Sequence, residues 1–331
     1  MSPKSKNTPQ EDLRPSSELS EDELLQRVMK DVKTLSSLVK DLRKQHNEYR
    51  IVFGAKLHAI QSMLVIERIF STITAEDLRN VGIVKKHLAF QSDEVTTSAA
   101  NMMANPGVEA EMQDLRSRIQ RIYGRVDIDH PSGSRMIIEA MLLSMTEILS
   151  ISTQAQRSPM GFAILPGIKI AQGFEDEVKI DHPTNLIPQL RLTGPSNVDH
   201  LVVEYKDIKD HKERLLSPGG SKDIDSVLEI SQLGFFIVQV KSGPNFTFVS
   251  YIPEAVGQAI SLLTSRNLPE VRFCLTDGAI WMFFILKRQD QTFMYYQSAM
   301  RFFGHAAQLR QTIVLLCEWL RPTKAGLYTL E

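Results

Sequence analysis

Two polar residues stand near the end of the most apolar strand-like stretch of the sequence. Residues 235–240 are aromatic or β-branched on both faces, apart from a single glutamine, with a glycine nearby on each side, a pattern typical of a buried central strand. Gln239 and Lys241 are two residues apart and therefore project from the same face of a sheet. Because an unpaired ammonium is very costly to bury, Lys241 needs either a partner or a route to water.

Other polar residues also interrupt apolar patterns. Asp199 stands at the entrance of an apolar strand-like run, residues 201–203, where a carboxylate is either a turn acceptor or a ligand. Glu139 lies beside the apolar stripe of a helix expected at residues 135–149. Gln258 follows a glycine in a helix expected at about residues 253–265.

The elements before the central strand predict a hairpin. Residues 190–193 and 198–205 are strand-like runs joined by Gly194-Pro-Ser-Asn, which is a favourable turn. The proline-rich stretch before them, residues 154–189, predicts an irregular connector with one short strand at residues 162–164.

The elements after the hairpin complete a mixed sheet flanked by helices. Residues 206–229 are a polar insert that precedes the central strand. Residues 271–275 and 280–286 predict a second hairpin around Thr276-Asp-Gly278. Residues 298–320 predict a long apolar helix that ends the domain.

The N-terminal part is expected to be mainly helical. Residues 1–19 have the composition of a disordered tail. After a capping-box sequence, Ser20-Glu-Asp-Glu23, apolar residues spaced alternately three and four apart predict a helix over residues 25–42. Its heptad-like stripe is either a dimer seam or the inner face of an ordinary amphipathic helix.

Further helices are expected at residues 51–70, 80–90 and 108–123, with a loop at residues 91–106. Asp127-Ile-Asp-His130 is either a metal-binding group or, as favoured here, a polar connector to the next helix. The expected organisation is therefore a tail (1–19), a helical region with a short coiled-coil-like helix (20–130) and an α/β domain (131–331).

Composition limits the classes of protein that the chain can be. Its 331 residues, 43% of them hydrophobic, can bury a sizeable core, and the net charge of −1 provides no overall basic field for nucleic acid. The two cysteines provide no disulfide framework or zinc set. Because there is neither an apolar leader nor a run of eighteen apolar residues, we expect an intracellular protein, cytoplasmic or nuclear and not secreted, that has no membrane partner.

In their order along the chain, these residues resemble a known family. Glu139, Asp199, the Gln239-Val-Lys241 triplet and Gln258 are similar to the core of the PD-(D/E)xK, or restriction-endonuclease-like, nuclease superfamily. The turn at Asp277-Gly278, followed by Trp281, is similar to fungal and Crinkler-type members. The resemblance covers residues 134–296 and does not extend to the N-terminal helices. It implies an α/β (α+β) fold with a restriction-endonuclease-like mixed β-sheet core flanked by helices, which the mainly helical N-terminal region would precede.

The resemblance implies a metal-dependent nuclease that hydrolyses phosphodiester bonds of DNA, with RNA as a further substrate class. Asp199, Gln239 and Glu139 would hold Mg²⁺ or Mn²⁺, and Lys241 would orient the attacking water and stabilise developing negative charge. Gln258 would position the metal or the phosphate. Gln239 departs from the family, which usually has a carboxylate there, and Glu139 could restore that charge.

Other interpretations remain open at this level. Asp223 and Asp225 are alternatives to Asp199 as the bridging ligand. The same fold could have an inactive centre and bind nucleic acid or protein, with the N-terminal helices forming a homodimer or holding a protein partner. A helical scaffold with an unrelated small sheet domain is the third interpretation. Walker, dinucleotide, H-E-x-x-H and G-x-S-x-G motifs are absent from the sequence, so it gives no support to those enzyme classes.

Overall fold

The computed structural model describes residues 26, 29–37, 65–153, 160–171, 177–182, 189–217, 224–231, 234–241, 248–290, 292–323 and 326–331. The chain divides into two units, Met1–Val65 and Ile66–Glu331. The predicted tail and most of the heptad-like helix lie outside the described residues, although residues 29–37 are helical as the periodicity predicts. The functional candidates all belong to the second unit.

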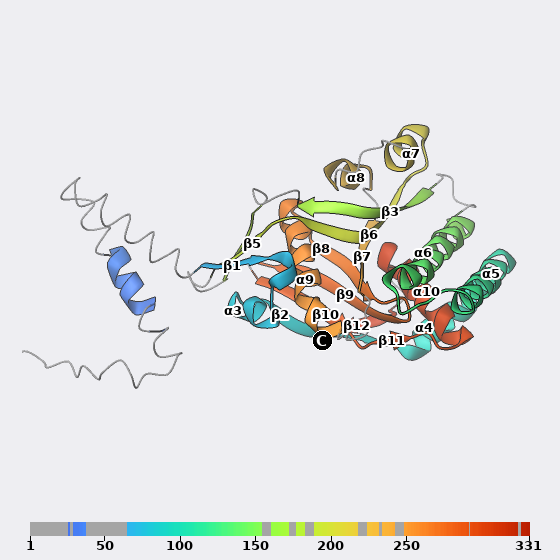
Figure 1. Ribbon diagram of the computed structural model, residues 1–331, viewed down its shortest axis with the longest axis horizontal. Helices are drawn as coiled ribbons and strands as arrows, with labels where there is room; N and C mark the ends of the chain where they lie inside the picture. Colours follow the sequence, from blue (N-terminus) through green and yellow to red (C-terminus); the bar gives the residue numbers. More distant parts are fainter. Residues whose placement is uncertain are drawn as a thin grey trace, which may run out of the picture. The chain divides into compact units, whose positions relative to one another are not determined.

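The second unit has a mixed α/β architecture built on one large sheet (Figure 1). The strand order in the described residues is β12-β2-β10-β9-β8-β7-β6-β3, and β11 pairs with β9. The predicted central strand is β7, which lies between β6 and β8. The strands, in chain order, are β2 (Val84–Phe90), β3 (Met160–Ala171), β6 (Ser196–Lys206), β7 (Gly234–Val240), β8 (Glu270–Thr276), β9 (Ile280–Gln289), β10 (Thr292–Ser298), β11 (Arg301–Phe302) and β12 (Tyr328–Leu330).

A continuous segment of the chain forms the part of the sheet that carries the candidate site. It runs from helix α6 (Pro131–Thr153) through β3, β6 and β7 to helix α9 (Phe248–Ser265) and β8. β3 pairs antiparallel with β6, and β6 pairs antiparallel with β7. β7 and β8 are parallel, with α9 as the crossover between them. The predicted helix, central strand and following helix are therefore present in this order.

The expected hairpin between residues 190–193 and 198–205 is wrong. β5 (Gln189–Thr193) belongs to a separate three-stranded sheet of order β1-β5-β4, with β1 (Val65–Ile69) and β4 (Val178–Asp181). β6 pairs instead with β3, a strand of twelve residues within the stretch expected to be irregular. Since β3 and β7 occupy both edges of β6, no edge is left for β5. Pro166 is tolerated in β3 because β3 is an edge strand.

Three predictions in the N-terminal part are also wrong. Of the helix expected at residues 51–70, residues 65–69 form the strand β1, and residues 51–64 lie outside the described residues. Residues 80–90 are not a helix: α3 (Ala75–Asn80) ends there, and β2 follows, pairing parallel with β10 and antiparallel with β12. Residues 91–106 are not a loop, because α4 (Ser92–Met103) packs Val95 and Ala99 into the core. The helix α5 (Pro106–Tyr123) is confirmed. Residues 66–130 thus contribute to the same compact unit as residues 131–331.

The sheet separates two apolar cores. Ile237, Phe273 and Phe284 face the core on the α9 side, whereas their neighbours Phe236 and Phe283 face the other core. The second core is covered by α4, α5, α6 and α10 (Ala306–Leu320), which lie together at one side of Figure 1. This alternation follows from the two-residue period of a strand.

Helices are also present after β11 and in the insert between β6 and β7. The expected final helix, residues 298–320, is shorter than predicted, because α10 begins at Ala306 after the short strand β11. The insert between β6 and β7 contains α7 (Lys209–Leu216) and α8 (Ile224–Ile230). α6 is long and apolar enough to span a membrane, but most of its apolar window is buried inside the unit, as expected for a core helix.

Candidate functional site

The two glutamines of the predicted site lie against each other on the α9 side of the sheet. Gln239 of β7 and Gln258 of α9 are both buried. The amide nitrogen of Gln239 donates to the side-chain carbonyl of Gln258 and, at 3.3 Å, to the backbone carbonyl of Asn197. Gln258 donates to the same carbonyl at 3.2 Å. Because both hydrogens of the Gln239 amide are donated, its carbonyl oxygen is the atom left to ligate a cation.

Lys241 follows the last residue of β7 and has a partner that the sequence did not reveal. Its ammonium lies 2.9 Å from Oε2 of Glu254 on α9, and the two side chains are only 20% and 17% exposed. The ring centroid of Tyr251 lies 5.0 Å from the same ammonium. The backbone N–H of Lys241 donates to Thr276 of the neighbouring strand at 2.9 Å. Both the side chain and the backbone of Lys241 are therefore fixed.

Glu254 is the main residue of this site that sequence reasoning missed. It precedes Gln258 by four residues on α9, so the two side chains lie on the same face of the helix. The four-residue spacing from Gln258 was the signal in the sequence that could have identified Glu254. Glu204, at the far end of β6, is paired with Arg321 at 3.1 Å and not with Lys241.

Asp199 lies at the end of the ladder between β6 and β7. The last paired residues are His200 and Val238, and beyond them the carboxylate of Asp199 accepts the backbone N–H of Val240 at 2.8 Å. Its other oxygen accepts from Arg135 on α6, also at 2.8 Å. The side chain is 19% exposed. Asp199 is thus adjacent to the backbone that leads into Lys241, and it is reachable from solvent.

Glu139 lies on the other side of the sheet from the glutamines. Its side chain is 53% exposed, and Oε1 is 3.7 Å from Nε2 of His200. His200 shares the α6 side with Val202, whereas Leu201 faces the α9 side. Burial lowers the pKa of His200, although the charges of Asp199 and Glu139 act in the opposite direction. The carboxylates of Asp199 and Glu139 therefore both lie near this buried imidazole.

The predicted residues thus form two groups at one end of the sheet, with Asp199 at the rim between them. The α9-side group provides amides and an ion pair, whereas the α6-side group provides an exposed carboxylate and a histidine. The α9-side group is Gln239, Lys241, Glu254 and Gln258, and the α6-side group is Arg135, Glu139 and His200.

The donor types suit a hard divalent cation, although the described residues contain no cluster of three or more His, Cys, Asp and Glu side chains close enough to hold one. Asp199 and Glu139 offer carboxylate oxygens, the ligands that Mg²⁺ prefers. The guanidinium of Arg135 competes for Asp199. Of the alternative ligands, Asp225 is paired with Arg266, and Asp223 lies outside the described residues.

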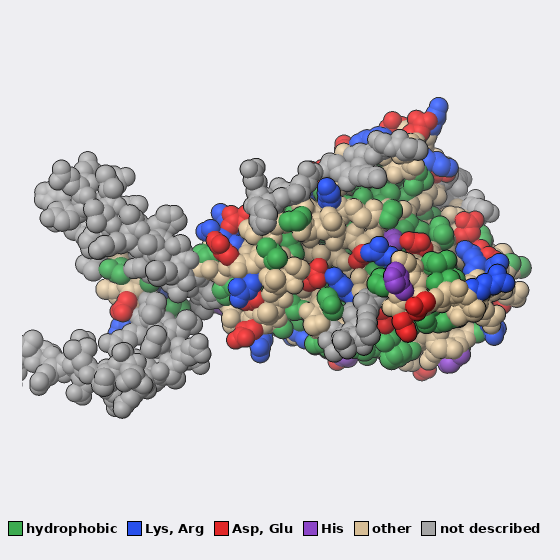
Figure 2. Space-filling model, viewed as in Figure 1, with side chains coloured by type: hydrophobic (Ala, Val, Ile, Leu, Met, Phe, Trp, Pro, Cys, Tyr) green, Lys and Arg blue, Asp and Glu red, His purple; other side chains and the backbone are tan. Residues whose placement is uncertain are grey.

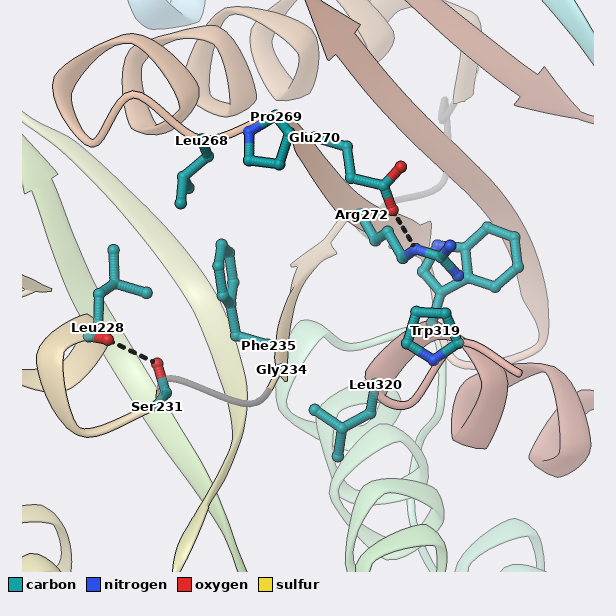
Figure 3. Close-up of a pocket in the computed structure, with 11 residues that line it drawn as sticks. Leu228, Ser231, Gly234, Phe235, Leu268, Pro269, Glu270, Arg272, Trp319 and Leu320 are labelled. Atoms are coloured by element: carbon teal, nitrogen blue, oxygen red, sulfur yellow. Dashed lines mark hydrogen bonds and ion pairs between the residues drawn. The ribbon is translucent and has the colours of Figure 1, made fainter. Parts of the chain in front are cut away.

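A hollow of about 330 Å³ lies at the opposite end of the strands (Figure 3). Gly234 and Phe235 at the start of β7 and Glu270 at the start of β8 contribute to its wall. Arg272 also lines it and donates to Glu270 at 2.9 Å and to the Tyr328 hydroxyl at 2.8 Å. None of the predicted site residues lines this hollow. The guanidinium of Arg272 is already bound by other residues of the protein.

Models of known protein families do not match the chain, and a comparison with curated proteins finds no similar sequence.

Proposed function

We propose that the chain is a metal-dependent nuclease whose centre lies where β6 and β7 end. The observation that carries the proposal is the contact between the Asp199 carboxylate and the backbone N–H of Val240, at 2.8 Å. It brings a partly exposed carboxylate beside the residue that precedes Lys241. A carboxylate and a lysine in adjacent strands, with Gln239 and Gln258 next to them, fit the arrangement that the sequence resemblance implies.

Each side chain has a role that its contacts allow. Asp199 would hold Mg²⁺ or Mn²⁺ together with Glu139, and the ion would provide charge stabilisation at the phosphate. Gln239 is buried on the other side of the sheet from Glu139, so its amide oxygen would not share an ion with that carboxylate. An ammonium has three donors, and Lys241 uses one of them on Glu254. The other two are available to orient a water molecule or to stabilise a phosphate oxygen. Gln258 holds the amide of Gln239 in place.

A second candidate function is supported by the same contacts. Lys241 is paired with Glu254, and Asp199 is paired with Arg135. Glu139 is also more than half exposed. These pairings neutralise the charges that catalysis would use, which favours a catalytically inactive centre on a fold that binds nucleic acid or a protein partner.

Cleavage assays separate the two candidates. The full chain is incubated with plasmid, single-stranded DNA and RNA in Mg²⁺ or Mn²⁺, beside Lys241→Ala and Asp199→Ala. Glu229→Ala is the matched control, because it removes an exposed carboxylate of α8 that is paired with Arg214 and has no role in the proposed centre. We expect cleavage by the wild type and by the control, and loss of at least about a hundredfold in the two site variants.

Cleavage that persists in both site variants would show that the centre is elsewhere. Absence of cleavage on all substrates, together with a Mn²⁺ titration that shows no binding, would reject the nuclease and favour the binding function.

A further inference from the structure

The charges of α5 are separated along the helix. Its acidic residues, Glu109, Glu111 and Asp114, all lie in the first half. Residues 115–125, which include the C-terminal half and the first residues after it, contain four arginines and neither aspartate nor glutamate. The chain as a whole has a net charge of −1, so a partner with negative charge would need a local basic surface of this kind.

The acidic residues of α5 already have partners. Arg118 binds Glu111 and, at 2.9 Å, Asp114. Glu109 binds Arg310 of α10 at 2.8 Å.

Arg116, Arg121 and Arg125 are different, because all three are exposed and none forms an ion pair with another described residue. Figure 2 shows Lys and Arg side chains gathered over α5. Guanidinium groups without a carboxylate partner are available to an external anion.

Two of these arginines border an open hollow on the surface. Ser117, Gln120, Arg121, Gly124 and Arg125 line it, and its volume is about 390 Å³. Arg121 lies in the last turn of α5 and Arg125 follows the end of the helix, and both line the hollow. The Ser117 hydroxyl already donates to the backbone carbonyl of Gln113 at 2.9 Å. Guanidinium and amide groups are donors, and arginine binds phosphate oxygens in a bidentate manner. The lining is therefore complementary to phosphate.

This surface lies at the same end of the sheet as Lys241. The connector after α5 packs against the start of α6, since a Cβ on Gly133 would come within 2.0 Å of the carbonyl oxygen of Asp127. The start of α6 packs against the turn between β8 and β9, where a Cβ on Gly278 would come within 2.9 Å of the Ser134 carbonyl oxygen. Thr276, immediately before that turn, accepts the backbone N–H of Lys241.

Tyr123 gives an independent sign of the same proximity. Burial raises the pKa of its hydroxyl, and the negative charge of Asp277 in the β8–β9 turn raises it further. The ring is nevertheless 45% exposed. An exposed aromatic ring between the arginines and the strand ends is a group on which an unpaired base could stack.

We propose that Arg121 and Arg125, with Gln120, bind the phosphate backbone of a nucleic acid whose scissile bond lies at Asp199 and Lys241. This inference rests on the proposed function, but α5 lies outside the segment that resembles the nuclease family. Asp127 and Asp129 in the following connector are exposed and oppose such binding, so the attraction is confined to the hollow and the adjacent turn of α5.

Binding of fluorescently labelled duplex and single-stranded oligonucleotides, followed by anisotropy without divalent metal, tests the proposal. The double variant Arg121→Ala/Arg125→Ala should bind about tenfold more weakly near physiological salt, and the slope of log K against log salt should become shallower by about two. Arg116→Ala is the matched control, because Arg116 is exposed and unpaired but does not line the hollow. It should bind like the wild type.

Three results would overturn the inference in different ways. Binding by the double variant equal to that of the wild type would reject the α5 surface and leave the nuclease proposal intact. An equal loss in Arg116→Ala would show that general charge, and not this hollow, attracts the oligonucleotide. A wild-type protein that binds neither oligonucleotide and cleaves neither would reject the proposed function together with the surface.

Discussion

The ammonium of Lys241 and the carboxylate of Glu254 form an ion pair of 2.9 Å between the end of β7 and the helix that follows it. Both side chains are mostly buried, so each charge depends on the other for compensation. The pair determines both the stability of this end of the sheet and the orientation of the only lysine that the proposed centre contains.

Glu254→Gln should destabilise the protein by about 2 kcal/mol, less than a fully buried pair would lose because both side chains retain some solvent contact. The loss arises because Lys241 keeps its charge without a partner. Urea unfolding of the variant and the wild type measures this loss of stability. The double variant Lys241→Met/Glu254→Gln should recover part of the loss. A double variant less stable than Glu254→Gln would contradict this account.

Arg135→Ala should strengthen binding of Mn²⁺ by severalfold. The guanidinium binds Asp199 at 2.8 Å and competes with a cation for the same carboxylate, and close charges of this kind interact by about 1 kcal/mol or more near a protein surface. Titration calorimetry compares the variant with the wild type, with Arg135→Lys as the charge-retaining control. Weaker binding in Arg135→Ala would show that Arg135 supports the metal site instead of competing with it.

Asp77 should make stability dependent on acidic pH. Burial acts to raise its pKa, but hydrogen bonds from Arg68 and Thr74 outweigh this effect, and the pKa in the folded state lies below the ordinary value of 3.8. Its contribution is therefore complete above the unfolded pKa and is lost as the pH falls through the lower folded value. Asp77→Asn should lose about 1 kcal/mol at pH 7.

The stability difference between Asp77→Asn and the wild type should shrink as the pH falls below about 4. Urea unfolding of the wild type and of Asp77→Asn, at several pH values across this range, measures the difference in stability. Thr74→Ala provides the comparison, because it removes the other half of the same capping box without removing an ionisable group. A difference for Asp77→Asn that stays constant with pH would mean that the charge of Asp77 has no part in the cap.

Cys274 and Cys317 should not react with thiol reagents in the native protein. Both are buried, and burial raises the pKa of Cys317 to about 12 and that of Cys274 well above its ordinary value. The thiolate is the reactive form. Labelling with a thiol reagent at pH 8 should modify neither residue before unfolding and both after it. Rapid labelling of the folded chain would show that β8, which contains Cys274, or α10, which contains Cys317, opens readily.

Local patterns in the sequence account for the elements whose signal lies within a few residues. The β-branched run of β7, the Thr276-Asp-Gly278 turn between β8 and β9, and the periodic apolar residues of α5, α6 and α9 all specify their own structure. The period of two also predicts that Gln239 and Lys241 share a face of the sheet, and both contact α9 in the structure.

Tertiary structure decided which distant segments pair and which charges meet. β6 pairs with the proline-containing β3 instead of β5, and β2 joins β10 although they are about 200 residues apart in the chain. Lys241 is paired with Glu254, and Asp199 with Arg135, by contacts between separate elements. The hydrophobic periodicity and the β-propensity of a segment determine that it forms a strand and which side chains share a face. The strand with which it pairs depends on which strand edges remain free once the chain has packed.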